Sequence, residues 1–113
     1  MLGECQVHLA NRAVTGFVIV KPGHFFGRDF IELLMVDPAA RRSGIGRALL
    51  QQALAVAGTS QVFTSTNTSN QAMRSLLQAE DWSFSGELDG LDEDDLELVF
   101  YKTRPAKPSQ LNH

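Results

Sequence analysis

The stretch FIELLMVDPAARRSGIGRALL, residues 30–50, decides how this chain folds. It begins with a nearly continuous apolar run, Phe30 to Val36, which predicts a central β-strand covered on both faces. Asp37-Pro38 ends that strand, because proline has no N–H to give to the ladder. From Ser43 onward the apolar residues recur at three- and four-residue spacing, which indicates an amphipathic helix. A short basic loop with two glycines therefore joins a strand to a helix.

This strand–loop–helix junction predicts an anion site. The N–H groups of a first helical turn have no partner within the helix, and the helix dipole makes that end positive. Arg41, Arg42 and Arg47 add positive charge at the same end. Phosphate is the anion that such a junction most often binds. The stretch lacks the Gly-Lys-Ser/Thr ending of a P-loop, and it lacks the third glycine and the acidic residue of a dinucleotide fingerprint.

The rest of the chain predicts an α+β fold with the element order β-β-β-α-β-α-β-β. The strand after the first helix is expected to run parallel to residues 30–36, which gives a mixed, mostly antiparallel sheet. Three layers would result if the helices covered both faces of this sheet. Residues 24–29 are expected to form a loop or a bulged extension of a strand. The predicted strands are 4–9, 14–20, 30–36, 61–66, 82–86 and 96–103, and the predicted helices are 45–57, ended by Gly58, and 72–79.

Length and composition limit the class of protein. The chain has 113 residues, so we expect one domain, residues 1–103, followed by a flexible tail, 104–113. A net charge of −3 argues against a general nucleic-acid binder. Cys5 is the single cysteine, the first residues lack a signal-peptide pattern, and no apolar run approaches the ~20 residues that span a bilayer. We therefore expect a cytoplasmic protein that needs no membrane, and no cluster has the spacing of metal ligands.

Two motifs resemble the GNAT superfamily of N-acetyltransferases. They are LMVDP, residues 34–38, and RRSGIGRALL, residues 41–50. The second half of the chain is similar to the family too, through FTSTN (63–67), NQAMRSLL (70–77) and ELVFYK (97–102). The resemblance covers about residues 4–103. It implies a GNAT-like acyl-CoA N-acyltransferase fold that transfers an acetyl group from acetyl-CoA to a primary amine of a small molecule or a protein.

The resemblance also implies which residues hold the donor. The strand that ends at Val36 would splay from its parallel neighbour, so that the pantetheine arm pairs with exposed main-chain groups. The loop amides would then wrap the pyrophosphate, in agreement with the anion site. The family places a cofactor-contacting asparagine at Asn70, which would also serve as a helix N-cap. The implied donor-binding residues are Leu34, Met35, Val36, Arg41, Arg42, Ser43, Gly44, Ile45, Gly46, Arg47, Asn67 and Asn70.

The chain departs from the family in three places. Family members usually begin with one more strand and one or two helices, so this sequence resembles a short form, whether natural or a piece of a longer protein. The apolar face left without those elements would favour a homodimer. The family's usual tyrosine, which protonates the leaving thiolate, aligns with Leu77. Where the family usually has Gly-Phe after this helix, the chain has Asp81-Trp82. Aspartate tolerates a left-handed helix cap less well than glycine.

Two residues are the first candidates for proton transfer. Glu32 is a carboxylate within an apolar strand, where desolvation would make it a stronger base, although an exposed or arginine-paired position is the simpler interpretation. Tyr101 could supply the missing acid, or it could simply pack in a half-buried site. His24 and His8 are further base candidates. If none of these acts, the alternative is a weak or inactive CoA-binding or interaction module.

The stretch from Glu87 to Glu97 is strongly acidic, and no Lys or Arg occurs between Arg74 and Lys102. It is either a solvated loop or an acidic lip that attracts a cationic acceptor. Its carboxylates are Glu87, Asp89, Asp92, Glu93, Asp94, Asp95 and Glu97.

Overall fold

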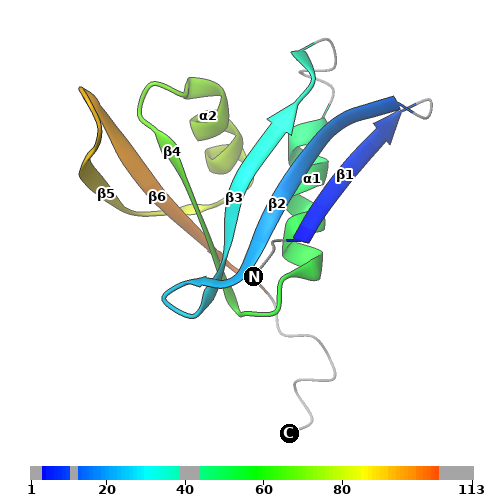
Figure 1. Ribbon diagram of the computed structural model, residues 1–113, viewed down its shortest axis with the longest axis horizontal. Helices are drawn as coiled ribbons and strands as arrows, with labels where there is room; N and C mark the ends of the chain where they lie inside the picture. Colours follow the sequence, from blue (N-terminus) through cyan, green and yellow to red (C-terminus); the bar gives the residue numbers. More distant parts are fainter. Residues whose placement is uncertain (1–3, 11–12, 39–43, 105–113) are drawn as a thin grey trace, which may run out of the picture.

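The computed structural model describes residues 4–10, 13–38 and 44–104. Six strands form one sheet in the order β1-β2-β3-β4-β6-β5, and two helices pack against it (Figure 1). Strands β3 and β4 are parallel, whereas the other neighbouring strands are antiparallel. The predicted α+β class and the mixed sheet are confirmed. The elements are β1 (Glu4–Ala10), β2 (Ala13–Phe25), β3 (Arg28–Val36), α1 (Ile45–Val56), β4 (Gln61–Asn67), α2 (Gln71–Ala79), β5 (Ser83–Asp92) and β6 (Asp95–Thr103).

Both helices lie on the same face of the sheet (Figure 1). A single apolar core joins them to β2, β3 and β4, and its fully buried members include Val18, Ile31, Leu49, Val62 and Leu77. The sequence-based expectation that β3 is covered on both faces is therefore wrong for the described residues. The described fold has two layers, one of sheet and one of helices, because neither described helix lies on the opposite face of the sheet.

The face opposite the helices, called the outer face below, carries a row of aromatic rings. Phe30 pairs with Phe63 across β3 and β4, and Phe63 pairs with Tyr101 across β4 and β6. Their rings follow the same order, with the Phe63 and Tyr101 centroids 5.6 Å apart. Phe25 covers part of the row, since its ring lies 5.4 Å from Phe30 and 4.9 Å from Phe63. Neither described helix covers this aromatic row.

Asp29 joins the strands at the first paired position of β3 and β4, where it lies opposite Val62. Its carboxylate is buried and accepts the N–H groups of Gly23 at 3.0 Å and Gly58 at 2.7 Å. Its own N–H donates to the Thr59 hydroxyl, which donates in turn to the carbonyl of Gln61. These bonds tie β2, the end of α1 and the start of β4 to β3. We call this the closed end of the pair.

Several predicted boundaries change. For residues 24–29 the bulged strand extension, and not the loop, is the alternative that the structure confirms, because β2 continues to Phe25 with an irregularity after Lys21 and β3 begins at Arg28. The expected strand 82–86 extends to Asp92, so the acidic stretch is a β-hairpin and not a loop. Asn67 and Ser69 hold that hairpin through hydrogen bonds to Asp92 and Asp95.

The end of α1 and the end of the folded domain also differ from the expected ones. Helix α1 is capped by Ala57 in an extended conformation, so Gly58 is not a left-handed cap and instead donates to Asp29. Arg104, predicted to lie in the tail, donates its N–H to the Ser60 carbonyl and its guanidinium to the carbonyls of Leu54 and Ala57. Residues 105–113 lie outside the described part of the chain. No helix in that part is long and apolar enough to cross a bilayer.

Candidate functional site

Strands β3 and β4 separate after a short paired segment. Their pairing runs from Asp29 opposite Val62 to Ile31 opposite Thr64. The next residue, Glu32, is extra in the register between β2 and β3, because Ile31 pairs with Val20 and Leu33 with Ile19. Such a β-bulge bends the strand that contains it and ends pairing with a neighbour. In Figure 1 the two strands diverge upward from the paired segment, which leaves an edge of β3 without a ladder partner on β4.

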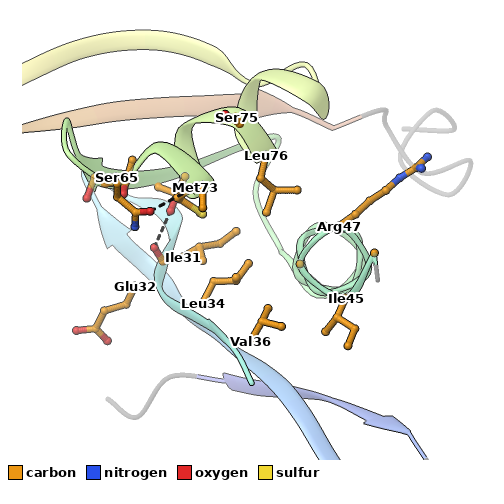
Figure 2. A pocket seen from close by; sticks show the side chains of 16 residues that line it. Ile31, Glu32, Leu34, Val36, Ile45, Arg47, Ser65, Met73, Ser75 and Leu76 are labelled. Atoms are coloured by element: carbon orange, nitrogen blue, oxygen red, sulfur yellow. Dashed lines mark hydrogen bonds between the residues drawn. The ribbon is translucent and has the colours of Figure 1, made fainter. Parts of the chain in front are cut away.

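A pocket of about 770 Å³ occupies this opening. Figure 2 shows that Leu34 and Val36 of β3 point toward Ile45 of α1 and Leu76 of α2, so the floor of the pocket is apolar. Polar groups enter from β4 and α2. The lining residues are Ile31, Glu32, Leu34, Val36, Gly44, Ile45, Gly46, Arg47, Thr64, Ser65, Thr66, Asn70, Ala72, Met73, Ser75 and Leu76. Met35 is half exposed and lies outside this lining, so of the three predicted strand residues two line the pocket with their side chains.

The N-terminus of α1 faces the same pocket. Gly44 is its N-cap, with a left-handed φ of 82° that favours glycine, and it provides no side-chain cap. The first intrahelical bond runs from the Ala48 N–H to the Gly44 carbonyl, so the amides of residues 45–47 have no acceptor in the helix. The first turn holds no acidic residue. This end of the helix is therefore suited to an anion.

Two residues of this first turn, Gly46 and Arg47, have distinct surroundings. A Cβ built on Gly46 would lie 3.0 Å from Leu76 Cδ2, so glycine is what allows α1 to approach α2 this closely. The Arg47 guanidinium extends from the outer side of the turn, and its Nε lies 3.3 Å from Glu80 Oε2 (Figure 2). Gly44, Ile45, Gly46 and Arg47 are thus brought together as expected, whereas Arg41, Arg42 and Ser43 lie outside the described residues.

The two predicted asparagines occupy different places. Asn70 lines the pocket and is also the N-cap of α2, where its Oδ1 accepts the N–H of Met73 at 3.2 Å. Asn67 instead donates its side-chain amide to Asp92 at 2.8 Å and is not among the lining residues. The structure therefore joins Asn70 to the pocket and Asn67 to the acidic hairpin.

Glu32 lies at the edge of the pocket and points away from its apolar floor (Figure 2). Its carboxylate is 3.0 Å from Lys21 Nζ, and the side chain is 45% exposed. The desolvated setting that motivated its role as a base is absent, because water reaches the carboxylate and a lysine pairs with it. Among the described residues that line the pocket, Glu32 is still the single carboxylate.

The remaining candidates for proton transfer do not line the pocket. Tyr101 lies beside Phe63 in the aromatic row on the outer face, with its ring tilted against that of Phe63. His24 is exposed near Phe30, with ring centroids 6.1 Å apart, and the His8 side chain lies outside the described atoms. Leu77 is fully buried in the core. Among the described residues, no group of three His, Cys, Asp or Glu side chains could hold a metal ion.

Apart from Asn70, sequence reasoning missed the part of the pocket contributed by β4 and α2. Ser65 and Thr66 follow the last paired position of β4, at the carboxyl end of a parallel strand, where ligands commonly bind in open sheets. Met73 and Leu76 belong to the apolar stripe of α2, which the sequence predicted as a helix without linking it to the site. The parallel relation of β3 and β4 was the signal that could have found Ser65 and Thr66.

Comparison with known proteins gives a consistent family. Residues 3–80 match the model of the acetyltransferase (GNAT) family. A GNAT-family acetyltransferase from Bacillus cereus is 32% identical, with a TM-score of 0.85, 90% of this chain covered and 71% of that one. An N-acetyltransferase from Staphylococcus aureus is 25% identical, with a TM-score of 0.70 and coverage of 89% and 67%.

A third structure shares the fold at lower identity. It is a Bacillus anthracis protein assigned as a streptothricin acetyltransferase, in complex with acetyl coenzyme A, with 18% identity and a TM-score of 0.82. The match covers 92% of this chain and 64% of the Bacillus anthracis chain. This chain therefore spans about two thirds of the length of the three structures. A search of curated proteins gave no match.

Proposed function

The chain belongs to the GNAT family of acetyltransferases, and from that premise we propose that it transfers an acetyl group from acetyl-CoA to a primary amine. The acceptor would be a small molecule or an amine of a protein. The observation that carries this proposal is the opening between β3 and β4, which leads from the N-terminus of α1 along an unpaired edge of β3.

The chemistry of the pocket fits an acyl-CoA. The amides of Ile45, Gly46 and Arg47 and the positive end of α1 suit a pyrophosphate. The edge of β3 offers main-chain groups that an amide-containing arm can pair with, and Leu34, Val36 and Leu76 supply apolar contact. In the Bacillus anthracis protein of the same fold, acetyl coenzyme A is the bound molecule. Arg41, Arg42 and Ser43 remain proposed donor contacts from the sequence motif.

The proposed reaction is direct attack of the neutral amine on the thioester carbonyl. A C–N bond forms, the C–S bond breaks, the thiolate leaves with the electron pair and the amine loses one proton. We propose Glu32 as the group that accepts this proton, directly or through water, since it is the carboxylate at the pocket. Tyr101 could reach the thiolate only across the sheet, so we propose that the thiolate takes its proton from solvent. A thiol has an ordinary pKa of about 8.5, so this leaving group needs little help from an acid.

A cationic acceptor fits the charge distribution. All seven carboxylates from Glu87 to Glu97 stand on the β5–β6 hairpin or its turn as exposed or half-exposed groups, and Asn67 links Asp92 to the end of β4. Their field would draw a polyamine, an aminoglycoside or a lysine side chain toward this end of the sheet. Such steering weakens with salt, so the rate with a cationic acceptor should fall as ionic strength rises.

A non-catalytic role is the alternative, and one observation favours it. Leu77 stands where the family has its acid tyrosine, and it is fully buried in the core. A CoA-binding or interaction module would bind acetyl-CoA without releasing free thiol in the presence of any amine. In either role we propose a homodimer that covers the aromatic row, and a cytoplasmic location in keeping with the single cysteine.

The experiment combines calorimetry with a thiol-release screen. The chain should bind acetyl-CoA, and at least one amine of a broad panel should cause release of free thiol. Glu32→Gln should slow release roughly a hundredfold, which is the usual contribution of a general base. The matched control is Asp81→Asn, an exposed carboxylate just after α2 that lies outside both the pocket lining and the acidic stretch, so it removes the same charge and should keep the rate. Absence of binding at millimolar acetyl-CoA contradicts the proposal, and a full rate for Glu32→Gln removes Glu32 from the mechanism.

A further inference from the structure

A threonine hydroxyl closes the point at which β3 and β4 part. Thr64 is opposite Ile31 at the last paired position, and its Oγ1 donates to the Ile31 carbonyl at 3.0 Å. The two side chains are 1% and 2% exposed, and both line the pocket. Figure 2 draws this bond at Ile31, where β3 leaves its neighbour. A side-chain bond therefore reinforces the ladder where its main-chain pairing ends.

The position of this bond determines where the opening begins. One residue further along β3 lies the bulge at Glu32, and beyond it Leu34 and Val36 face the pocket. On β4 the following residues, Ser65 and Thr66, line the opposite wall. If the Thr64 bond were lost, the buried Ile31 carbonyl would lose a donor and the last pair would loosen. The walls of the pocket would then no longer start from a fixed point.

We propose that Thr64 is a positioning residue for the acyl donor: its hydroxyl fixes the end of the β3–β4 pairing and so sets the width of the opening. The inference rests on the proposed function, because it concerns the donor assigned to this pocket. Thr64 touches Ile31 and acts through the backbone of β3, whose unpaired edge is the proposed partner of the pantetheine arm. A small displacement of such a wall lowers both affinity and rate, since the thioester must be held close to the attacking amine.

The closed end of the same strand pair supplies a matched comparison. Thr59 makes two hydroxyl bonds there, accepting the Asp29 N–H at 3.0 Å and donating to the Gln61 carbonyl at 2.7 Å. It is half buried and lies outside the pocket lining. Valine has nearly the same shape as threonine, so replacement of Thr64 or Thr59 by valine removes one hydroxyl and little else. A purely structural role for both threonines predicts equal behaviour toward the donor, whereas the positioning role predicts a difference.

The experiment compares Thr64→Val, Thr64→Ser and Thr59→Val by calorimetry with acetyl-CoA and by thermal unfolding. Thr64→Val should weaken acetyl-CoA binding roughly tenfold, the equivalent of one buried hydrogen bond. Thr64→Ser keeps the hydroxyl that donates the hydrogen bond, so its affinity for acetyl-CoA should stay within about threefold of that of the parent chain. Thr59→Val should lower the melting temperature at least as much as Thr64→Val, yet keep the affinity within about threefold. Equal affinity of all three variants and the parent chain overturns the inference.

Amide hydrogen exchange tests the same point without acetyl-CoA. In Thr64→Val the amides of residues 63–65 should exchange roughly fivefold faster than in the parent chain, while Thr59→Val should leave them unchanged. Unaltered exchange in Thr64→Val overturns the inference even when the donor binds. Failure of the parent chain to bind acetyl-CoA contradicts the proposed function instead, and the exchange data still decide whether Thr64 fixes the end of the pairing.

Discussion

The N-termini of the two helices are built differently although both border the same pocket. Helix α2 begins at Asn70, whose side chain accepts the Met73 N–H, so one of its free amides is satisfied by its own chain. Helix α1 begins at Gly44, which has no side chain to offer and a left-handed φ of 82°. The helix with the internal cap needs no ligand at its start. The helix without one presents its amides to the pocket.

This difference shows how a sequence can reserve one helix end for a ligand. A side-chain cap in place of Gly44 would stabilise α1 by roughly a few tenths of a kcal/mol. A side chain there would also occupy the space in front of the amides that the pyrophosphate is proposed to use. The same reasoning explains Gly46, since any Cβ would press against Leu76 at 3.0 Å. Local stability is given up at α1 and kept at α2.

The largest expected effect comes from reversing charge at the α1 terminus. Arg47→Glu should weaken acetyl-CoA binding roughly tenfold to a hundredfold, because it replaces attraction to a pyrophosphate by repulsion. The matched control is Gln71→Glu, which places the same new carboxylate in the first turn of α2, outside the pocket lining. It should change the affinity less than twofold. Similar losses in the two variants, measured by calorimetry, would mean that the helix ends do not differ in the proposed way.

A smaller effect is expected from filling the contact between the helices. Gly46→Ala improves helix propensity but brings a methyl group to 3.0 Å from Leu76, so acetyl-CoA affinity should fall roughly fivefold without loss of stability. Gly58→Ala is the control, because its Cβ would meet Asp29 at 3.9 Å and lie far from the pocket. Titration and thermal unfolding of both variants check this. Unchanged affinity in Gly46→Ala would show that the spacing of the helices is irrelevant to the donor.

Asn70 allows the cap and the proposed donor contact to be separated. Asn70→Ala should lower the free energy of unfolding by about 1 kcal/mol, the usual value of an N-cap. Asn70→Asp keeps the cap, so its stability should stay near that of the parent chain, while the added charge should weaken acetyl-CoA binding about threefold. Denaturant unfolding and calorimetry on the two variants give both quantities. If Asn70→Asp binds acetyl-CoA as the parent chain does, Asn70 is a cap alone.

The smallest effect is expected at the other end of α2. Asp81 has a φ of 62° and donates its N–H to Gln78, while Trp82 donates to Leu77, which is the geometry of a left-handed C-cap. Glycine adopts that conformation without steric cost, so Asp81→Gly should raise the free energy of unfolding by roughly 0.5 to 1 kcal/mol. Acetyl-CoA affinity should not change. A loss of stability would indicate that the aspartate side chain makes a contact that outweighs its backbone strain.

The sequence predicted the elements near the junction well because strong local signals mark them. Proline after Val36, the apolar spacing from Ile45 onward and the polar turn before Gln71 locate β3, α1 and α2 to within a few residues. The left-handed conformation at position 81, expected where the family has glycine, is present as well. These features depend on neighbours in sequence, so a single chain reveals them.

Features that depend on distant pairing were not predictable in the same way. The bulge at Glu32 comes from the register with β2, and the exposure of its carboxylate follows from the open outer face and from Lys21. The separation of Asn67 from Asn70 depends on the β5–β6 hairpin, which captures Asn67 through Asp92. An acidic run reads as a loop from composition, but here its two halves pair with each other as β5 and β6.

The most direct test of the donor site is a titration of isotope-labelled protein with acetyl-CoA, followed by backbone amide NMR. The account predicts saturable shifts of the amides of Ile45, Gly46 and Arg47 and of residues 34–36, together with a smaller response at Gln71 in the first turn of α2. Shifts confined to other parts of the chain, or no shift of residues 45–47 at millimolar acetyl-CoA, would contradict the claim that α1 and the opening beside β3 bind the donor.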